Sequence, residues 1–265
     1  MRKASPLLIA QITDTHLFAS SQEELLGLQT DSSFKAVLRE IQALTPQPQG
    51  LLLTGDLSQD ETLASYQHLY QQLEPLQIPA YWLPGNHDQP QLMQEALTKP
   101  PTYGDKSFQL GSWQFILLNS AVPGRVYGYL SSETLEWLDK QLYNNSHAPT
   151  LVALHHPPFS VNSHWIDTSR LINPEDLFRV LDCHPQVNLV VFGHIHQNFQ
   201  RDRAGVRYLA SPSSSIQFKP ECDRFALDEL QPGYRLFWLY ENGEFATTVK
   251  RVEFSYTVDL AATGY

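Results

Sequence analysis

Short apolar runs alternate with amphipathic stretches over the first ninety positions of the chain. Unbroken apolar runs of this length are typical of strands that are buried on both faces. Between them, apolar residues recur at helical spacing, as at Phe34, Val37 and Ile41. The pattern predicts strand, helix, strand, helix and strand, in that order, over residues 7–12, 31–44, 51–53, 61–73 and 78–83. The run Asp31-Ser32-Ser33 is expected to cap the first helix.

The same pattern continues through the rest of the chain. It predicts helices over 131–143 and 174–182, and strands over 107–110, 113–119, 151–154, 187–192, 206–210, 234–240 and 244–252. Residues 212–233 are expected to form a long, structured loop. Alternating strands and helices favour an α/β fold. A chain of 265 residues is long enough for one large core, so we expect a single domain over 1–265.

Side chains that can bind metals follow five of the predicted strands, at the point where each strand ends. They are Asp14 with His16, Asp56 with Asp60, the run Asn86-His87-Asp88, the pair His155-His156, and His194 with His196. Sites in open α/β sheets gather at the carboxyl ends of strands. A single Asp-X-His or Gly-Asp is more often a surface pair or a turn. The ordered set of five predicts a metal site, and its ligand types suit iron, manganese and zinc.

Residue spacing gives a first division of these ligands. Residues two apart in an extended chain point to the same face, so Asp14 and His16 are expected to reach one ion if the chain stays extended. His194 and His196 have the same spacing. Adjacent residues point to opposite faces. His155 and His156 are therefore not expected to bind one ion, and we assign His156 a supporting or core position.

Charge and composition exclude several classes of protein. The net charge of −10 shows no basic excess, which argues against a nucleic-acid-binding surface. No apolar stretch approaches the roughly 18 residues of a membrane span. The apolar run that follows Arg2 and Lys3 is too short for a signal peptide. The cysteines Cys183 and Cys222 suggest no disulfide framework. We therefore expect a cytoplasmic protein without a membrane or nucleic-acid partner, and a homodimer as the commonest assembly.

Together, the strand-end motifs resemble the calcineurin-like metallophosphoesterase family in order and spacing, over residues 7–210. The matching motifs are Asp14-X-His16, Gly55-Asp56, Gly85-Asn86-His87-Asp88, His155 and Gly193-His194-Ile195-His196. The resemblance implies a four-layer α/β/β/α sandwich and two metal ions. It assigns one metal to Asp14, His16, Asp56 and His196, and the other to Asp56, Asn86, His155 and His194. Asp56 then bridges the two ions, and His87 contacts the phosphate and protonates the leaving group.

A finer resemblance is to bacterial class III 3′,5′-cyclic-AMP phosphodiesterases. It rests on residues 11–18, 54–60, 82–88 and 193–197, and on later segments that include 211–213, 217–220, 232–235 and Thr263-Gly264-Tyr265. It implies that the chain hydrolyses cyclic AMP to 5′-AMP through a metal-bridging hydroxide and lowers cellular cyclic AMP. It also implies iron and manganese as the metals, with zinc as the alternative. The residues expected to contact the substrate are His16, Asp56, Asn86, His87 and His196.

Other functions remain open at this point. The same metal chemistry serves other small diesters, such as a 2′,3′-cyclic nucleotide or a glycerophosphodiester. A metal-dependent nuclease is disfavoured by the acidic charge. A non-catalytic nucleotide or metal sensor is disfavoured by the complete ligand set. A nucleotide substrate would also need a pocket for its base. From their positions in the sequence, we expect Phe18, the loop of Trp165 and residues 213–218 to line this pocket. For residues 213–218 the alternative is a purely structural role in packing at the sheet edge.

Overall fold

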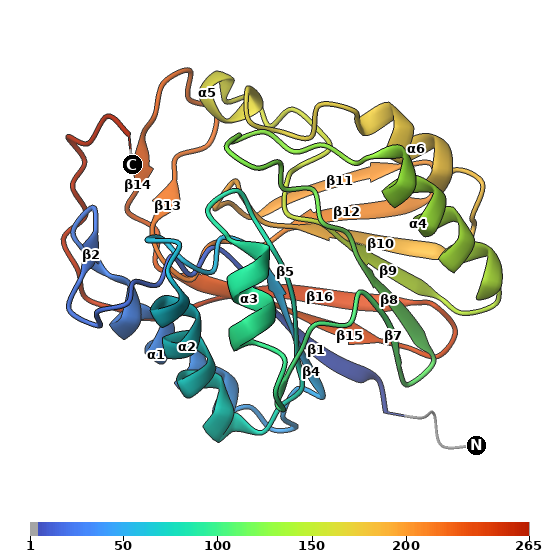
Figure 1. Cartoon of the computed structure of the whole chain (residues 1–265), viewed down its shortest axis with the longest axis horizontal. Helices are drawn as coiled ribbons and strands as arrows, with labels where there is room; N and C mark the ends of the chain where they lie inside the picture. Colours follow the sequence, from blue (N-terminus) through green and yellow to red (C-terminus); the bar gives the residue numbers. More distant parts are fainter. Residues whose placement is uncertain (1–4, 265) are drawn as a thin grey trace.

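Two six-stranded sheets stacked face to face form the centre of the molecule, and helices cover the outer face of each (Figure 1). The computed structural model describes residues 5–264. Arg2, Lys3 and Tyr265, which entered the sequence argument, lie outside this range. The layers therefore follow one another as helices, sheet, sheet, helices, and the predicted four-layer α/β/β/α sandwich is confirmed.

The first sheet contains four neighbouring parallel strands. In order across the sheet, its strands are β16 (Phe245–Arg251), β15 (Gly233–Leu239), β1 (Leu7–Ile12), β4 (Gly50–Thr54), β5 (Ala80–Leu83) and β6 (Thr102–Tyr103). β15 runs antiparallel to β1, whereas β4 and β5 run parallel to it. Its helical layer consists of α1 (Thr30–Gln42), α2 (Leu63–Leu73), the short 3-10 helix η1 (Glu74–Leu76) and α3 (Pro90–Ala96).

The second sheet repeats this plan with antiparallel strands at its two edges. Its order is β11 (Phe199–Arg203), β12 (Val206–Ala210), β10 (Val187–Phe192), β9 (Thr150–Ala153), β8 (Trp113–Leu117) and β7 (Ser107–Leu110). Helices α4 (Ser132–Asn144) and α6 (Pro174–Leu181) cover it. The remaining elements are short: β2 (Glu24–Leu25), β3 (Leu28–Gln29), α5 (His164–Asp167), β13 (Gln217–Phe218) and β14 (Leu227–Asp228).

Each central strand contributes to two cores, because successive side chains on a strand point to opposite faces. On β1, Ile9 packs between the two sheets, whereas Ala10 and Ile12 pack under the helices. Phe115, Val191 and Phe237 lie in the same inter-sheet layer as Ile9. Two buried faces explain why these strands appear in the sequence as unbroken apolar runs.

Each predicted helix and strand is present within a few residues of its expected bounds. One capping prediction is wrong. Helix α1 begins at Thr30 after Gln29, which makes no side-chain cap hydrogen bond, and Asp31 pairs instead with Lys35 one turn later. The sequence pattern missed α3, which has seven residues, and β11, which is mostly exposed and therefore lacks an apolar signal. The predicted loop over 212–233 contains the β13–β14 hairpin.

Both cysteines, Cys183 and Cys222, are free thiols, as the sequence indicated. Among residues 5–264, no helix combines the length and the apolar character needed to cross a membrane.

The inter-sheet layer should dominate the stability of the fold. Phe237 is fully buried between the sheets, whereas Tyr143 at the end of α4 is 76% exposed. We expect Phe237→Ala to lower the free energy of unfolding by about 3–5 kcal/mol, because it leaves a cavity between the sheets. Tyr143→Ala should change it by less than about 0.5 kcal/mol. Urea unfolding of both variants measures the difference, and equal effects would contradict this account of the core.

Candidate metal centre

The loops that follow β1, β4, β5, β9 and β10 meet at one end of the two sheets. The loops after β1 and β4 are joined by backbone hydrogen bonds, from Asp14 N to Gly55 O at 3.0 Å and from His16 N to Asp56 O at 3.0 Å. The two sheets are joined here as well, because the backbone N–H of His194 donates to both carboxylate oxygens of Asp14 at 3.1 Å. The predicted gathering of strand-end residues is therefore present.

The backbone at these residues is not extended. Asp14, His16, His194 and His196 have φ angles of +54°, +46°, +68° and +50°, in the left-handed region. The extended chain assumed for both pairs is therefore absent: Asp14 and His16 nevertheless share one ligand group, whereas His194 and His196 do not. Non-glycine residues adopt this conformation only where surrounding contacts hold them, and such residues are concentrated at functional sites.

One group of potential ligands contains Asp14, His16 and His196. Their ligand atoms lie within 4.8 Å of one another, and all three side chains are buried. His16 Nε2 lies 3.3 Å from His196 Nε2, which lies 3.4 Å from Asp14 Oδ1. This is the set that spacing and family resemblance placed around the first metal, apart from Asp56.

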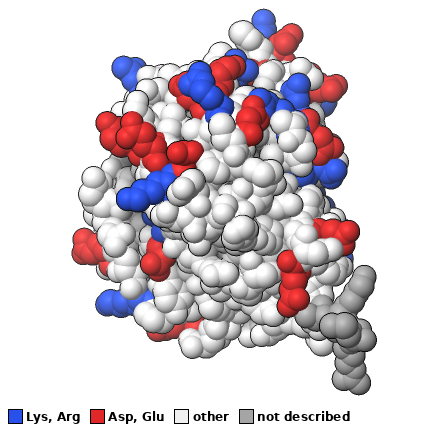
Figure 2. Space-filling model, turned by 90° about the vertical axis from the view of Figure 1, so that its right-hand side faces the viewer, with Lys and Arg blue, Asp and Glu red and all other residues white. Residues whose placement is uncertain are grey.

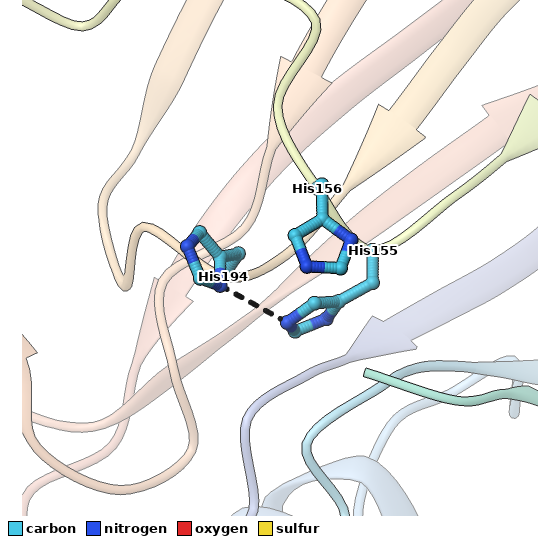
Figure 3. A group of neighbouring side chains, drawn as sticks. All are labelled: His155, His156 and His194. Atoms are coloured by element: carbon cyan, nitrogen blue, oxygen red, sulfur yellow. Dashed lines mark hydrogen bonds between the residues drawn. The ribbon is translucent and has the colours of Figure 1, made fainter. Parts of the chain in front are cut away.

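A second group consists of His155, His156 and His194, which Figure 3 shows pointing toward one another. His194 Nδ1 lies 3.2 Å from His155 Nε2. The expectation that His155 and His156 cannot share an ion fails, because β9 ends at Ala153 and the strand alternation does not extend to them. His194 and His196 belong to different groups, as the resemblance implied and the spacing did not.

Asp56 lies between the two groups. Its carboxylate forms a third set with Asp14 and His155. Asp56 Oδ1 accepts a hydrogen bond from the backbone N–H of His87 at 2.9 Å. Asp56 Oδ2 accepts none from residues 5–264 and lies 3.2 Å from His155 Nε2, outside hydrogen-bonding geometry. Gly85 allows this packing, because a Cβ there would lie 2.1 Å from Asp56 Oδ1.

Each histidine is oriented by a contact from one ring nitrogen to an oxygen outside the ligand groups. Nδ1 of His155 donates to Thr54 O at 2.8 Å, and Nδ1 of His196 donates to Ile216 O at 2.8 Å. Nδ1 of His16 donates to Gln59 Oε1 at 2.7 Å. His194 uses Nε2 instead, 2.8 Å from Ser169 Oγ. Contacts of this kind fix the tautomer and leave the other nitrogen to face a metal.

The orienting role of these groups was not predicted from the sequence. Gln59 lies in the 54–60 motif but was given no role there, Ser169 lies in no motif, and a backbone carbonyl such as Ile216 O has no sequence signal. Asp60, grouped with Asp56 from the sequence, lies outside the ligand groups. Its carboxylate accepts hydrogen bonds from Ala19 N and Thr62.

Burial sets the protonation of the centre. It lowers the pKa of His16 to about 3 and holds the pKa of His194 well below its ordinary value, which keeps both rings neutral. Burial also opposes charge on His155, but the Asp56 carboxylate outweighs it and raises the pKa of His155 to about 9. Neutral imidazole and ionised carboxylate are the forms that bind metals, so a metal at His155 would displace the proton that Asp56 stabilises there.

The turn after β5 completes the centre. The Asn86 side-chain oxygen is buried and accepts no hydrogen bond from residues 5–264. The half-buried His87 ring lies 5.2 Å from the His16 ring, centroid to centroid. Both residues line a cavity of about 640 Å³, whose opposite wall is residues 119–126. Asp88 holds the turn, since its carboxylate accepts hydrogen bonds from the backbone N–H groups of Gly85, Leu57 and Ser58.

The residues present fit a pair of cations. His16 Nδ1 and His196 Nδ1 contact Gln59 Oε1 and Ile216 O, which leaves the two Nε2 atoms 3.3 Å apart beside the Asp14 carboxylate. A cation placed among them would contact all three side chains. The unsatisfied oxygens of Asp56 and Asn86 are buried beside these nitrogens, and a buried acceptor without a partner costs about 1–3 kcal/mol. Bound cations would satisfy all of these atoms together.

Metal should therefore stabilise the fold. We expect Mn²⁺ to raise the unfolding temperature of metal-stripped protein, with a gain near 2.7 kcal/mol once free metal reaches about a hundred times its dissociation constant. Differential scanning calorimetry with a metal titration measures this. An unchanged unfolding temperature up to millimolar metal would contradict a buried metal centre.

Asn86 should contribute to only part of this binding. We expect Asn86→Ala to reduce the tightly bound metal from two ions toward one per chain, because it removes the unsatisfied amide oxygen. Asn119→Ala is the matched control, since Asn119 lines the same cavity but is exposed. Metal analysis after gel filtration gives the stoichiometry. Two retained ions in the Asn86 variant would remove Asn86 from the ligand set.

The fold of this chain is shared by known phosphatases. A dimetal phosphatase from Danio rerio superimposes with a TM-score of 0.72 over 97% of this chain and 100% of its own, at 15% identity. A purple acid phosphatase from yellow lupin gives a TM-score of 0.67 over 94% of this chain and 52% of its own, at 13% identity. At these identities the similarity shows the fold alone.

Sequence comparison gives the family. The profile of the calcineurin-like phosphoesterases matches residues 7–198. A 3′,5′-cyclic-nucleotide phosphodiesterase of Nostoc sp. is 50% identical over 99% of both chains. The 3′,5′-cyclic adenosine monophosphate phosphodiesterase CpdA of Vibrio vulnificus is 40% identical over 97% of this chain and 94% of its own. This chain belongs to the calcineurin-like phosphoesterase family.

Proposed function

We propose that this protein is a metal-dependent phosphodiesterase that hydrolyses 3′,5′-cyclic AMP to 5′-AMP and so lowers cellular cyclic AMP. The observation that carries the proposal is the pair of buried ligand groups joined by Asp56, with His87 beside them at the edge of a cavity. Such a site neutralises a phosphate and activates water. The choice of a cyclic nucleotide is supported by the relatives that carry that activity in their names at 50% and 40% identity.

Asp14, His16 and His196 would hold one ion, and His155 and His194 would hold the other. Asn86, whose side-chain oxygen lacks a partner among the described residues, would join the second group, and Asp56 would be shared by both. Imidazole, carboxylate and amide ligands together favour iron and manganese, with zinc as the alternative. His156 Nε2 faces the second group without a hydrogen-bond partner among the described residues. It is therefore an additional candidate ligand for the second ion.

When bound, the two ions supply positive charge for the phosphate oxygens and make water acidic enough to serve as the nucleophile near neutral pH. His16, Asp56, Asn86, His87 and His196 surround the position of the phosphate. His87 is half-buried, whereas the ligand side chains of both groups are buried, so its ring can exchange protons with solvent. The bond from its backbone N–H to Asp56 holds it beside the centre. From there it donates a proton to the departing 3′ oxygen.

We also propose that the protein is a cytoplasmic, single-domain homodimer that does not bind nucleic acid. Cyclic AMP is a cytoplasmic messenger, which favours a cytoplasmic location for the enzyme. The two sheets share one inter-sheet core, which favours a single domain, and a homodimer is the commonest assembly. On the face of residues 5–264 shown in Figure 2, basic and acidic side chains are interspersed without a continuous basic surface. The net charge of −10 disfavours the nuclease alternative.

The direct test is hydrolysis of cyclic AMP by metal-stripped protein, with and without added Mn²⁺ or Fe²⁺. We expect metal-dependent release of 5′-AMP, together with cleavage of bis(p-nitrophenyl) phosphate. Assays of 2′,3′-cyclic AMP and a glycerophosphodiester in parallel give the substrate preference. Cleavage of the aryl diester without turnover of cyclic AMP would retain the metal chemistry and reject this substrate.

The role of His87 is tested by the leaving group. An alkoxide needs a proton, whereas nitrophenolate leaves without one. We expect His87→Ala to lower kcat for cyclic AMP by about 10²–10⁴-fold and to slow the aryl diester far less. His147→Ala is the control, because His147 is exposed and remote from the motifs. Equal slowing of both substrates, with metal content unchanged, would argue against His87 as the proton donor.

A further inference from the structure

The C-terminal segment returns to the metal-centre end of the molecule. After β16 it passes the β2–β3 hairpin and reaches the neighbourhood of β14 (Figure 1). Phe254, Tyr256 and Val258 pack against the hydrophobic core under the second sheet, which Phe18 and Leu26 also contact. The backbone N–H of Asp259 donates to Leu26 O at 3.0 Å. The segment is therefore docked along its length.

A single glycine permits this docking. Gly27 has a φ of +86°, and a Cβ at this position would lie 2.1 Å from the backbone oxygen of Thr257. That contact is far below any real Cβ distance, so a side chain at residue 27 must displace the segment. Gly205, in the turn between β11 and β12, has nearly the same φ of +84° with nothing within 4 Å of its Cβ position.

The end of the segment closes one side of a cavity of about 690 Å³. The cavity is lined by Trp165, Asp223, Arg224, Phe225, Thr263 and Gly264. Trp165 and Phe225 are in edge contact, with ring centroids 5.0 Å apart. Its lining thus combines two aromatic residues, two charged residues and the C-terminal residues Thr263 and Gly264.

This cavity is one aromatic ring away from the metal centre. Phe218 stacks on the ring of His196 at 4.0 Å with an interplanar angle of 11°. Phe218 in turn makes an edge-to-face contact with Trp165, with ring centroids 4.9 Å apart. His196, Phe218 and Trp165 therefore form a continuous row of rings from the metal centre to the cavity.

We propose that this cavity binds the nucleobase of the substrate and that residues 254–264 are its fixed outer wall. The inference rests on the proposed function and adds a base subsite to it. Flat bases stack on aromatic side chains, and Trp165 and Phe225 offer such surfaces. Trp165 Nε1 is buried without a hydrogen-bond acceptor among residues 5–264, and the ring nitrogens of a purine are acceptors. The cavity beside His87 has no aromatic wall other than that imidazole.

The test compares Gly27→Ala with Gly205→Ala in the full-length, metal-loaded enzyme. Both substitutions place a side chain at the same positive φ, but only the first displaces the C-terminal segment. The readouts are the KM for cyclic AMP and competitive inhibition by 5′-AMP, with bis(p-nitrophenyl) phosphate as the reporter substrate. We expect Gly27→Ala to weaken both nucleotide affinities by roughly tenfold, the loss of one stacked base. Its kcat/KM for the aryl diester should match that of Gly205→Ala.

A second variant keeps the proposal testable if Gly27→Ala fails to fold. Trp165→Leu should weaken inhibition by 5′-AMP roughly tenfold, whereas Arg125→Ala, in the cavity beside His87, should leave it unchanged. The reverse result would place the base in that other cavity and overturn the proposal. Normal nucleotide affinity in both Gly27→Ala and Trp165→Leu would also overturn it while leaving the phosphodiesterase activity standing. A wild-type enzyme that cleaves the aryl diester but neither turns over cyclic AMP nor binds 5′-AMP would refute the proposed function itself.

Discussion

The close approach of buried imidazole and carboxylate groups is the constraint on which the candidate metal centre depends. Two pairs of imidazole nitrogens approach to 3.3 Å and 3.2 Å, His16 with His196 and His155 with His194. Their outer nitrogens are already committed to Gln59, Ile216 O, Thr54 O and Ser169. Burial disfavours ionisation of His16 and His194, whereas the Asp56 carboxylate favours the protonated form of His155. The fold holds these groups together, and bound cations would satisfy the buried oxygens of Asp56 and Asn86 as well.

The fold supplies that restraint through contacts between segments far apart in sequence. Gln11 Nε2 donates to Thr54 Oγ1 at 2.9 Å and to Phe192 O at 3.0 Å, which ties the two sheets together just behind the centre. The hydroxyls of Ser213 and Ser215 donate to Asp14 O at 2.7 Å and 3.0 Å. These buried hydrogen bonds stabilise the left-handed backbone at Asp14, whose conformation alone would be unfavourable. The local strain at the centre is thus compensated by the surrounding sheets.

The candidate metal centre and the cavities beside it are built from different parts of the fold. The Asp and His side chains of the candidate metal centre follow strand ends and are buried. The cavities on either side are walled by connecting segments, residues 119–126 on one side and the 223–225 and 263–264 segments on the other. Loops tolerate change better than strands. Members of one family can therefore keep the metal centre while differing in the group that they accept beside the phosphate.

The sequence by itself determined the layered α/β fold and the strand-end positions of Asp14, His16, Asp56, Asn86, His155, His194 and His196. Apolar runs specify buried strands, and polar residues directly after them must lie at the sheet edge. Only the tertiary structure decided how these residues divide into groups. Spacing arguments assume an extended chain, but the backbone is left-handed at His16 and His194, and β9 ends before His155 and His156. The orienting groups and the C-terminal wall at Gly27 also depend on contacts between residues far apart in sequence. No local pattern encodes such contacts, because they form only when the two sheets pack.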